Sequence, residues 1–157
     1  MSSINYTIGD ATQPEGRPAM IVHVCNDVGA WGAGLVLAIS RRWPEPERTY
    51  RDWSRGPEAR AFALGEVSFV TVEPGLVVAN LVGQHGLRRR GADRPVRLEA
   101  IACGLRTVAV HARKLGASVH MPRIGCGLAG GTWTEIGPIV ERELCQRFVA
   151  VTVYDLA

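Results

Sequence analysis

Residues 121–131 read MPRIGCGLAGG, and this stretch decides how the rest of the chain is interpreted. An apolar run typical of a strand precedes it, and Thr132 and Glu135 behind it have the spacing of a helix capping box. Four glycines within seven residues free the backbone to turn N–H groups toward an anion. The following helix adds the positive end of its dipole. The stretch therefore predicts a loop that holds a phosphate or a diphosphate.

The spacing of these glycines matches neither the P-loop nor the dinucleotide-binding GxGxxG pattern. A second glycine-bearing stretch, CNDVGAWGAG at 25–34, has the same placement between an apolar run and a helix. Ligands of α/β sheets collect beyond the carboxyl ends of the strands. We therefore expect the two loops to flank one crevice and to hold the two phosphates of a diphosphate-bridged nucleotide. Either loop alone would be better explained as a tight turn, and it is the presence of two loops with the same placement that favours a ligand.

Strands and helices alternate along the chain. The patterns predict strands at 4–8, 19–24, 67–72, 76–81, 119–121 and 149–154, and helices at 34–43, 95–115 and 132–147. The two middle strands are separated by Glu73-Pro74-Gly75, which is typical of a hairpin turn. The polar, proline-containing segment 44–57 is expected to be a surface excursion. The order predicts an α/β layered domain with a mixed sheet, in which residues 1–157 form a single unit.

Composition adds few constraints. The chain has 157 residues, a net charge of +3 and 46% hydrophobic residues, which are ordinary values for a globular domain. Charged residues or glycines interrupt every apolar run, and the N-terminus lacks the layout of a signal peptide, so we expect a cytoplasmic monomer that spans no membrane. Cys25, Cys103, Cys126 and Cys145 are widely separated, which disfavours a zinc site and predicts buried free thiols. We expect no metal and no cofactor.

Three motifs together resemble one known family. They are GDAT at 9–12, the loop that contains Asn26 and ends in Gly32-Ala33-Gly34, and PRIGCGL at 122–128 with Trp133 behind it. The chain resembles the macrodomain family over nearly its whole length. PRIGCGL is particularly similar to the terminal ADP-ribose protein glycohydrolase branch and its bacterial relatives, some of which act on ADP-ribosylated DNA. The resemblance implies a three-layer α/β/α fold with a central mixed, mostly parallel sheet of about six strands and an ADP-ribose cleft at its crest.

The resemblance also implies roles for individual residues. Asp10, with Ala11 beside it, matches the acidic position that receives the adenine amino group, although a turn cap would explain it equally. Asn26 matches a position near the distal ribose. Tyr154 and Leu156 are candidate adenine neighbours, with packing of the last strand as the alternative. The first phosphate loop corresponds to Gly32, Ala33 and Gly34, and the second to Ile124, Gly125, Cys126, Gly127, Leu128 and Ala129.

The sequence departs from the family at its catalytic positions. The glycohydrolase branch uses a lysine near the end of a central strand and an aspartate after the GCGL run. Here the lysine region reads NLVGQHG at 80–86, and Ala129 occupies the aspartate position. The aspartate that the MacroD-type branch carries after its first loop is also absent, since Leu35 and Val36 stand there. Three hypotheses follow: an ADP-ribosyl hydrolase with a different active site, an ADP-ribose reader without turnover, or an ADP-ribose 1″-phosphate phosphatase.

A hydrolase would need other catalytic groups at the same edge of the sheet. His85 is a candidate general base at neutral pH, Gln84 could orient a water or the substrate, and Asp27 is another candidate base. Several arginines follow His85 in the sequence: Arg88, Arg89, Arg90, Arg94 and Arg97. They either form a solvated surface or contact the phosphates of a nucleic acid. The expected partners are therefore ADP-ribose, ADP-ribosylated protein or DNA, and single-stranded nucleic acid.

Overall fold

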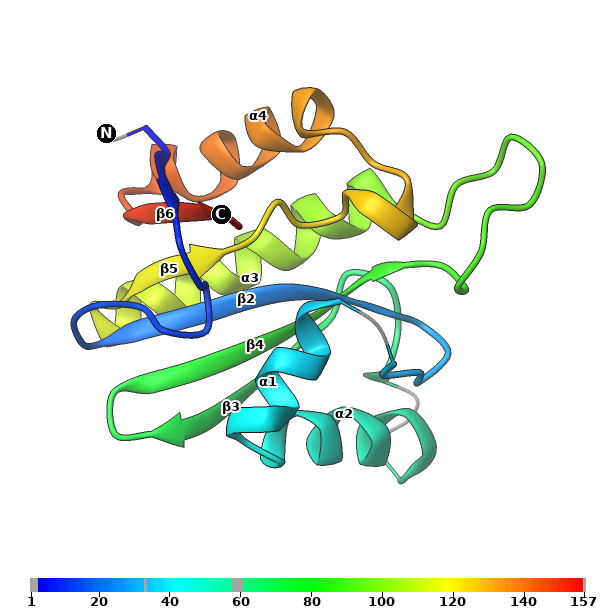
Figure 1. Cartoon of the computed structure of the whole chain (residues 1–157), viewed down its shortest axis with the longest axis horizontal. Coiled ribbons are helices and arrows are strands. Elements are labelled where there is room, and N and C mark those ends of the chain that lie inside the picture. Colours follow the sequence, from blue (N-terminus) through cyan, green and yellow to red (C-terminus); the bar gives the residue numbers. More distant parts are fainter. Residues whose placement is uncertain (1–2, 33, 58–60, 157) are drawn as a thin grey trace.

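A computed structural model describes residues 3–32, 34–57 and 61–156 (Figure 1). Its centre is a six-stranded sheet in the order β1-β6-β5-β2-β4-β3. The strands are β1 (Asn5–Ile8), β2 (Ala19–Asn26), β3 (Val67–Glu73), β4 (Leu76–Gln84), β5 (Ser118–Met121) and β6 (Val151–Asp155). Every neighbouring pair is parallel except the β3–β4 hairpin. The predicted mixed, mostly parallel sheet is confirmed.

Helices cover both faces of this sheet, which gives the three layers seen in Figure 1. The helices are α1 (Leu35–Arg42), α2 (Glu45–Arg55), α3 (Leu98–Leu115) and α4 (Trp133–Glu143). Successive side chains of a strand point to opposite faces, and β2 accordingly divides its residues between two cores. Met20 and Val22 belong to the core that contains α3 and α4, while Ile21 packs in the core under α1 and α2.

The expected surface excursion at 44–57 is wrong, because most of it forms α2. Pro46 stands near the start of this helix, where a fixed φ is compatible with the first turn. Tyr50 is fully buried and anchors the helix on the sheet. The remaining residues of α2 are nearly all polar, so the segment has a single narrow apolar stripe that composition does not reveal.

Other boundaries moved by a few residues. The long helix begins at Leu98 rather than 95, because Arg97 is still extended, and it ends as predicted at Gly116 in the left-handed region. The fourth helix ends at Glu143, and a short 3₁₀ turn follows at Cys145–Arg147. The prediction of buried thiols is correct for Cys25 and Cys145 and wrong for Cys103, which is exposed.

This topology places the two glycine loops together. β2 and β5 are parallel neighbours, so their carboxyl ends meet at one edge of the sheet. The chain then leaves β2 toward α1 on one face and leaves β5 toward α4 on the other. Connections that diverge to opposite faces open a crevice between the adjacent strand ends.

Candidate functional site

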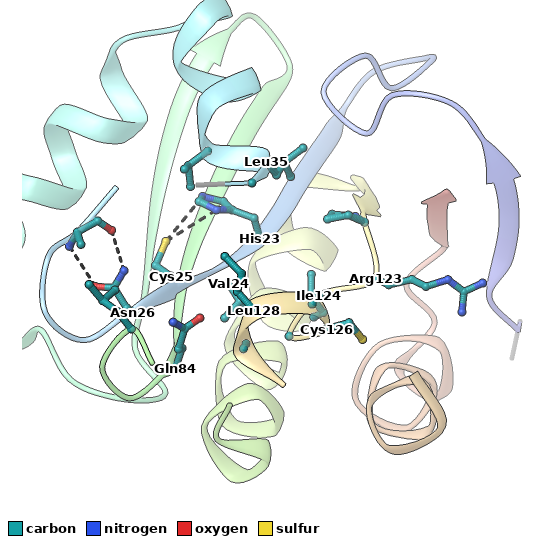
Figure 2. A pocket seen from close by; sticks show the side chains of 18 of the residues that line it. His23, Val24, Cys25, Asn26, Leu35, Gln84, Arg123, Ile124, Cys126 and Leu128 are labelled. Carbon is teal, nitrogen blue, oxygen red and sulfur yellow. Dashed lines mark hydrogen bonds between the residues drawn. The ribbon is translucent and has the colours of Figure 1, made fainter. Parts of the chain in front are cut away.

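A cavity of about 570 Å³ lies at this edge (Figure 2). Its floor comes from the end of β2, from His23 to Asn26, and from Gln84 at the end of β4. Gly32, Gly34 and Leu35 line it from the first loop, and Ile124, Gly125, Cys126, Gly127, Leu128 and Ala129 line it from the second. The prediction that both loops flank one crevice is confirmed. Ala33, also predicted for the first loop, lies outside the described residues.

The second loop needs its glycines for two different reasons. Gly125 and Gly127 both have positive φ, at 74° and 72°. A Cβ on Gly125 would also lie 2.7 Å from Ile136 Cδ1, so side-chain packing closes that position. The loop ends in a 3₁₀ turn at Gly127–Ala129, whose first amides have no acceptor within the turn. Amides at the start of such a turn are free to bind an anion.

The N-terminus of α4 stands behind this loop. Thr132 accepts a hydrogen bond from the Glu135 amide, and the Glu135 carboxylate accepts one from the Thr132 amide, which confirms the predicted capping box. Arg94 makes a bidentate pair with the same carboxylate at 2.8 and 3.0 Å. The hydrogen bonds from Arg94 and Thr132 lower the pKa of Glu135 to about 2. The helix start is therefore fixed in place and already holds one internal anion.

Asn26 shapes the first loop from within. Its side-chain oxygen accepts a hydrogen bond from the Val28 amide at 3.0 Å. The same oxygen accepts one from the Ala30 amide at 3.1 Å, and the Asn26 amide nitrogen donates to the Ala30 carbonyl at 2.7 Å; these two bonds are the dashed lines at Asn26 in Figure 2. The buried Tyr50 hydroxyl lies 2.8 Å from the same oxygen and 2.6 Å from the Asn26 carbonyl. Asn26 lines the cavity as predicted, but most of its hydrogen-bonding capacity holds the loop. Tyr50, which sequence reasoning missed, supports it from α2.

A chain of polar side chains ties the rest of this loop to α2. The Trp31 indole donates to the Ser40 hydroxyl at 2.8 Å, and Ser40 donates to Glu47 at 2.9 Å. Arg51 pairs with Glu47 at 2.9 Å and donates to the carbonyls of Gly29 and Trp31. Hydrogen bonds from Arg51 and Ser40 lower the pKa of Glu47, which therefore remains a carboxylate. The unpredicted helix α2 is thus the support of the first loop.

The two reactive side-chain types on the floor of the cavity, a histidine and a cysteine, are both held in their neutral forms. Burial lowers the pKa of His23 to about 4, although its hydrogen bond with Asn80 opposes the shift. The Asn80 amide nitrogen donates to Pro46 and Ser68, so its oxygen is the acceptor that faces His23 Nε2 at 2.6 Å. His23 is therefore neutral at physiological pH and carries its proton on Nε2. Burial raises the pKa of the neighbouring Cys25 thiol, which makes it a poor nucleophile.

The candidate catalytic residues lie at one end of the cavity. Gln84 lines it, and its amide nitrogen donates to the Gly86 carbonyl at 2.9 Å. Asp27 and His85 do not line it, but they pair with each other, with 2.6 Å between Asp27 Oδ2 and His85 Nδ1. Partial burial raises the pKa of Asp27, yet hydrogen bonds from the Gly86 amide and His85 outweigh it, and the net pKa lies below the ordinary value. The structure therefore joins two separately predicted residues into one unit.

Arg123 lines the opposite end of the cavity, away from Asn26 and Gln84 (Figure 2). Its guanidinium pairs with Asp155 at 2.7 and 3.0 Å and lies 5.4 Å from the ring centre of Tyr6 and 5.5 Å from that of Trp133. Cation–π contacts of this kind hold the side chain in one orientation. Sequence reasoning missed this cluster, whose one visible signal was the arginine within the PRIG motif.

The predicted adenine neighbours are occupied with local contacts. Asp10 accepts hydrogen bonds from the Thr12 amide and hydroxyl at 2.9 and 2.6 Å and from Gln13 at 3.1 Å, which is the turn-cap arrangement. Ala11 is buried, and the Tyr154 hydroxyl lies 2.8 Å from His120 Nδ1. Asp10, Ala11, Tyr154 and Leu156 are outside the cavity lining, so a role in adenine binding stays a prediction.

The arginine-rich segment divides into two groups. Arg94 pairs with Glu135, and Arg97 pairs with Asp93 at 3.1 Å. Within the described part of the chain, no salt bridge involves Arg88, Arg89 or Arg90, and all three are exposed. They follow Leu87, which lines the cavity and is 50% exposed, and Leu128 of the second loop also lines it and is 80% exposed, so both leucines lie where the cavity opens to solvent. Free positive charge and apolar surface therefore lie side by side at the mouth.

Residues 3–32, 34–57 and 61–156 lack two kinds of feature. They contain no cluster of three or more His, Cys, Asp or Glu side chains that could hold a metal ion. None of their helices is long and apolar enough to cross a membrane.

No family model matches the chain, but solved structures and curated proteins do. A macrodomain protein from Streptomyces coelicolor is 53% identical, with a TM-score of 0.86, and the match covers 98% of this chain and 99% of that one. The mouse chromodomain-helicase-DNA-binding protein 1-like is 30% identical over 98% of this chain, which spans 18% of the mouse protein. A DNA ADP-ribosyl transferase–DNA ADP-ribosyl glycohydrolase fusion protein from Thermosipho africanus is 25% identical over 82% of this chain and 36% of its own length.

Proposed function

The chain belongs to the macrodomain family, and on that premise we propose that it is an ADP-ribosyl hydrolase that removes ADP-ribose from protein or DNA. One observation carries this proposal. Two glycine loops on neighbouring strands, each followed by a helix, line a single cavity. Paired backbone amides on both sides of a cavity suit a ligand with two adjacent phosphates.

In this proposal the lining of the cavity favours one orientation of the ligand. A volume of about 570 Å³ lies within the range of small-molecule sites. The diphosphate would lie between Gly34 and Gly127, near the middle of the lining. The adenosine half would extend toward Arg123, on the side where Asp10 and Tyr154 were predicted to act. The distal ribose would then lie over Asn26 and Gln84, and the acceptor would leave the cavity between Leu87 and Leu128.

A DNA acceptor is supported by two independent observations. The Thermosipho africanus relative carries a DNA ADP-ribosyl glycohydrolase in its name. In this chain the exposed Arg88, Arg89 and Arg90 adjoin the mouth from which the acceptor would emerge. Arginines there would contact the phosphates that flank a modified nucleotide, and the neighbouring leucines would contact its base.

Binding without turnover is the second candidate function. It is favoured by the absence of the family's catalytic lysine and aspartate, since Gln84 or His85 lies near the lysine position and Ala129 occupies that of the aspartate. A reader would use the same cavity and loops. The two candidates therefore differ only in what happens at the bond between the distal ribose and its acceptor.

Two measurements test the proposal. Calorimetry with ADP-ribose tests the cavity, and the absence of binding at millimolar ligand would overturn both candidates. Release of ADP-ribose from modified single-stranded DNA and from modified protein tests the chemistry. Binding together with release of ADP-ribose supports the hydrolase. Tight binding with no release from either acceptor would instead support the second candidate, an ADP-ribose reader without turnover.

A further inference from the structure

The Asp27–His85 pair combines an anchored end with an open end. The Asp27 side chain is 17% exposed, whereas that of His85 is 59% exposed. Asp27 Oδ2 lies 2.6 Å from His85 Nδ1, and Oδ1 accepts the Gly86 amide hydrogen bond at 2.8 Å. Both carboxylate oxygens are therefore engaged by the protein, while the far side of the imidazole ring faces solvent.

The backbone fixes this pair at the ends of two adjacent strands. Asn26 and Gln84 are register partners in the parallel β2–β4 pair. The Asp27 amide then donates to the Gln84 carbonyl at 2.9 Å, and the His85 amide donates to the Pro95 carbonyl at 2.8 Å. The two side chains meet because their strands end together, so the arrangement exists before any ligand arrives.

The pairing decides which ring nitrogen can exchange a proton. The lowered pKa of Asp27 keeps it a carboxylate, so Nδ1 carries a hydrogen that it donates to Oδ2. Nε2 is then the nitrogen left for chemistry. His85 itself is outside the cavity lining, but Gln84 before it and Leu87 behind it are part of that lining. His85 therefore borders the cavity beside Asp27 of the first loop, and Nε2 is the ring nitrogen that the pairing with Asp27 does not use.

Resting on the proposed hydrolase function, we propose that His85 is the catalytic acid that protonates the departing acceptor, and that Asp27 is a positioning residue for it. The bond between the anomeric carbon and the acceptor atom breaks, and its electron pair stays on the acceptor atom. That atom takes the proton from His85 Nε2. A water oxygen bonds to the anomeric carbon and loses a proton to solvent, from which the imidazole is reprotonated. The products are ADP-ribose and the protonated acceptor.

Leaving groups of different quality test this role. When ADP-ribose is linked to a carboxylate, the acceptor departs as a stable carboxylate anion and needs no proton, whereas a nucleobase nitrogen acceptor needs one. We expect His85→Ala to lower kcat about 100-fold or more on the nucleobase-linked substrate. The same variant should leave kcat nearly unchanged on the carboxylate-linked substrate and should leave KM unchanged on both. Because the ring is exposed, added imidazole should restore part of the lost rate.

The Asp27→Asn variant tests the positioning role of Asp27. An asparagine oxygen still accepts the Gly86 amide but no longer holds the Nδ1 proton by charge, so kcat should fall on the nucleobase-linked substrate with KM unchanged. His111→Ala, a histidine stacked on Phe69 away from the cavity, is the matched control. ADP-ribose affinity and melting temperature, measured for every variant, verify that each one is folded.

The outcomes separate the two proposals. Equal slowing of both substrates by His85→Ala, or no slowing of either, would overturn the acid role while leaving the hydrolase intact. Failure of imidazole to restore any rate would also count against it. A wild type that binds ADP-ribose but releases none from either substrate would overturn the hydrolase itself and this inference with it.

Discussion

Gly125 in the second loop combines a left-handed backbone with close packing. Its φ is 74°, and an added Cβ would lie 2.7 Å from Ile136 Cδ1 and 3.0 Å from Ile101 Cδ1. Gly127, two residues on, has φ of 72° but no atom within 4 Å of the added carbon. The two positions therefore share the backbone requirement and differ in packing.

We expect Gly125→Ala to lower the free energy of unfolding by about 2–4 kcal/mol, since it combines left-handed strain with overpacking. Gly127→Ala should cost only the strain, about 1–2 kcal/mol. Urea unfolding of both variants measures the difference. Equal losses would show that the Ile136 and Ile101 contacts do not limit this position.

Which single residues the sequence could reveal depended on where their partners lie. The glycines of both loops and the capping box at Thr132 were readable because their geometry is local. Asp27 and His85 were each visible as candidates, but their pairing was not, because they lie 58 positions apart. The Arg123–Asp155 pair joins residues 32 positions apart and was missed altogether. Candidate site residues can be predicted from the sequence, whereas the contacts between them can be predicted only once the order of the strands in the sheet is known.

At the scale of elements, the first loop depends on α2. The Tyr50 hydroxyl joins this helix to both the side chain and the carbonyl of Asn26. Sequence patterns gave the sheet and three of the four helices but not α2, because its burial rests on Tyr50 and a few neighbours within a polar segment. The element that the sequence concealed is therefore the one that supports the site.

Tyr50→Phe tests this support. It removes the buried hydroxyl that lies 2.6 Å from the Asn26 carbonyl oxygen and 2.8 Å from its side-chain oxygen, and we expect a loss of about 1–2 kcal/mol in the free energy of unfolding. Amide hydrogen exchange at Val28 and Ala30 should also quicken. Tyr6→Phe is the matched control, because its hydroxyl lies on an exposed edge strand and loses one solvent-exposed hydrogen bond, from the Trp133 indole at 2.9 Å. A loss no larger than that of the control would refute the support role.

On the opposite face, α3 and α4 are joined through one buried carboxylate. Glu143 is 3% exposed and pairs with Arg106, Arg142 and Arg147 at 3.1–3.2 Å. Burial raises the pKa of Glu143, but hydrogen bonds and charges from Arg142 and Arg106 outweigh it, so the net pKa is below the ordinary 4.5. Because the pKa of Glu143 is lower in the folded than in the unfolded protein, its ionisation stabilises the fold at pH values above the unfolded pKa. This contribution is lost as the pH falls through the folded pKa.

Glu143→Gln should therefore be less stable than wild type at neutral pH, and the gap should narrow as the pH falls below about 4.5. Thermal unfolding across this range measures the gap. Glu141→Gln, an exposed change on the same helix, is the control and should give a small, nearly constant difference. A gap for Glu143→Gln that stays constant with pH would contradict the linkage.

At the scale of the whole molecule, basic residues lie near both ends of the parallel strands. Arg88, Arg89 and Arg90 lie next to the cavity mouth at the carboxyl ends of the parallel strands. Arg113 and Lys114, at the end of α3, lie beside a second cavity at the opposite edge. The net charge of +3 is too small to direct a polyanion to either edge by itself. We therefore expect position relative to the cavity, rather than net charge, to decide which basic residues would contact a nucleic-acid strand.

Replacing Arg88, Arg89 and Arg90 with alanine should weaken binding of an oligonucleotide while leaving the Kd for free ADP-ribose nearly unchanged. Each phosphate contact contributes about 0.7 to the slope of log K against log salt for single strands, so losing three should lower the slope by about 2. Fluorescence anisotropy across a salt series measures that slope. Arg113→Ala with Lys114→Ala is the matched control and should leave both ligands unaffected. An equal loss of affinity for oligonucleotide and ADP-ribose would mean that the arginines support the cavity itself, and an unchanged slope would place the nucleic-acid strand elsewhere.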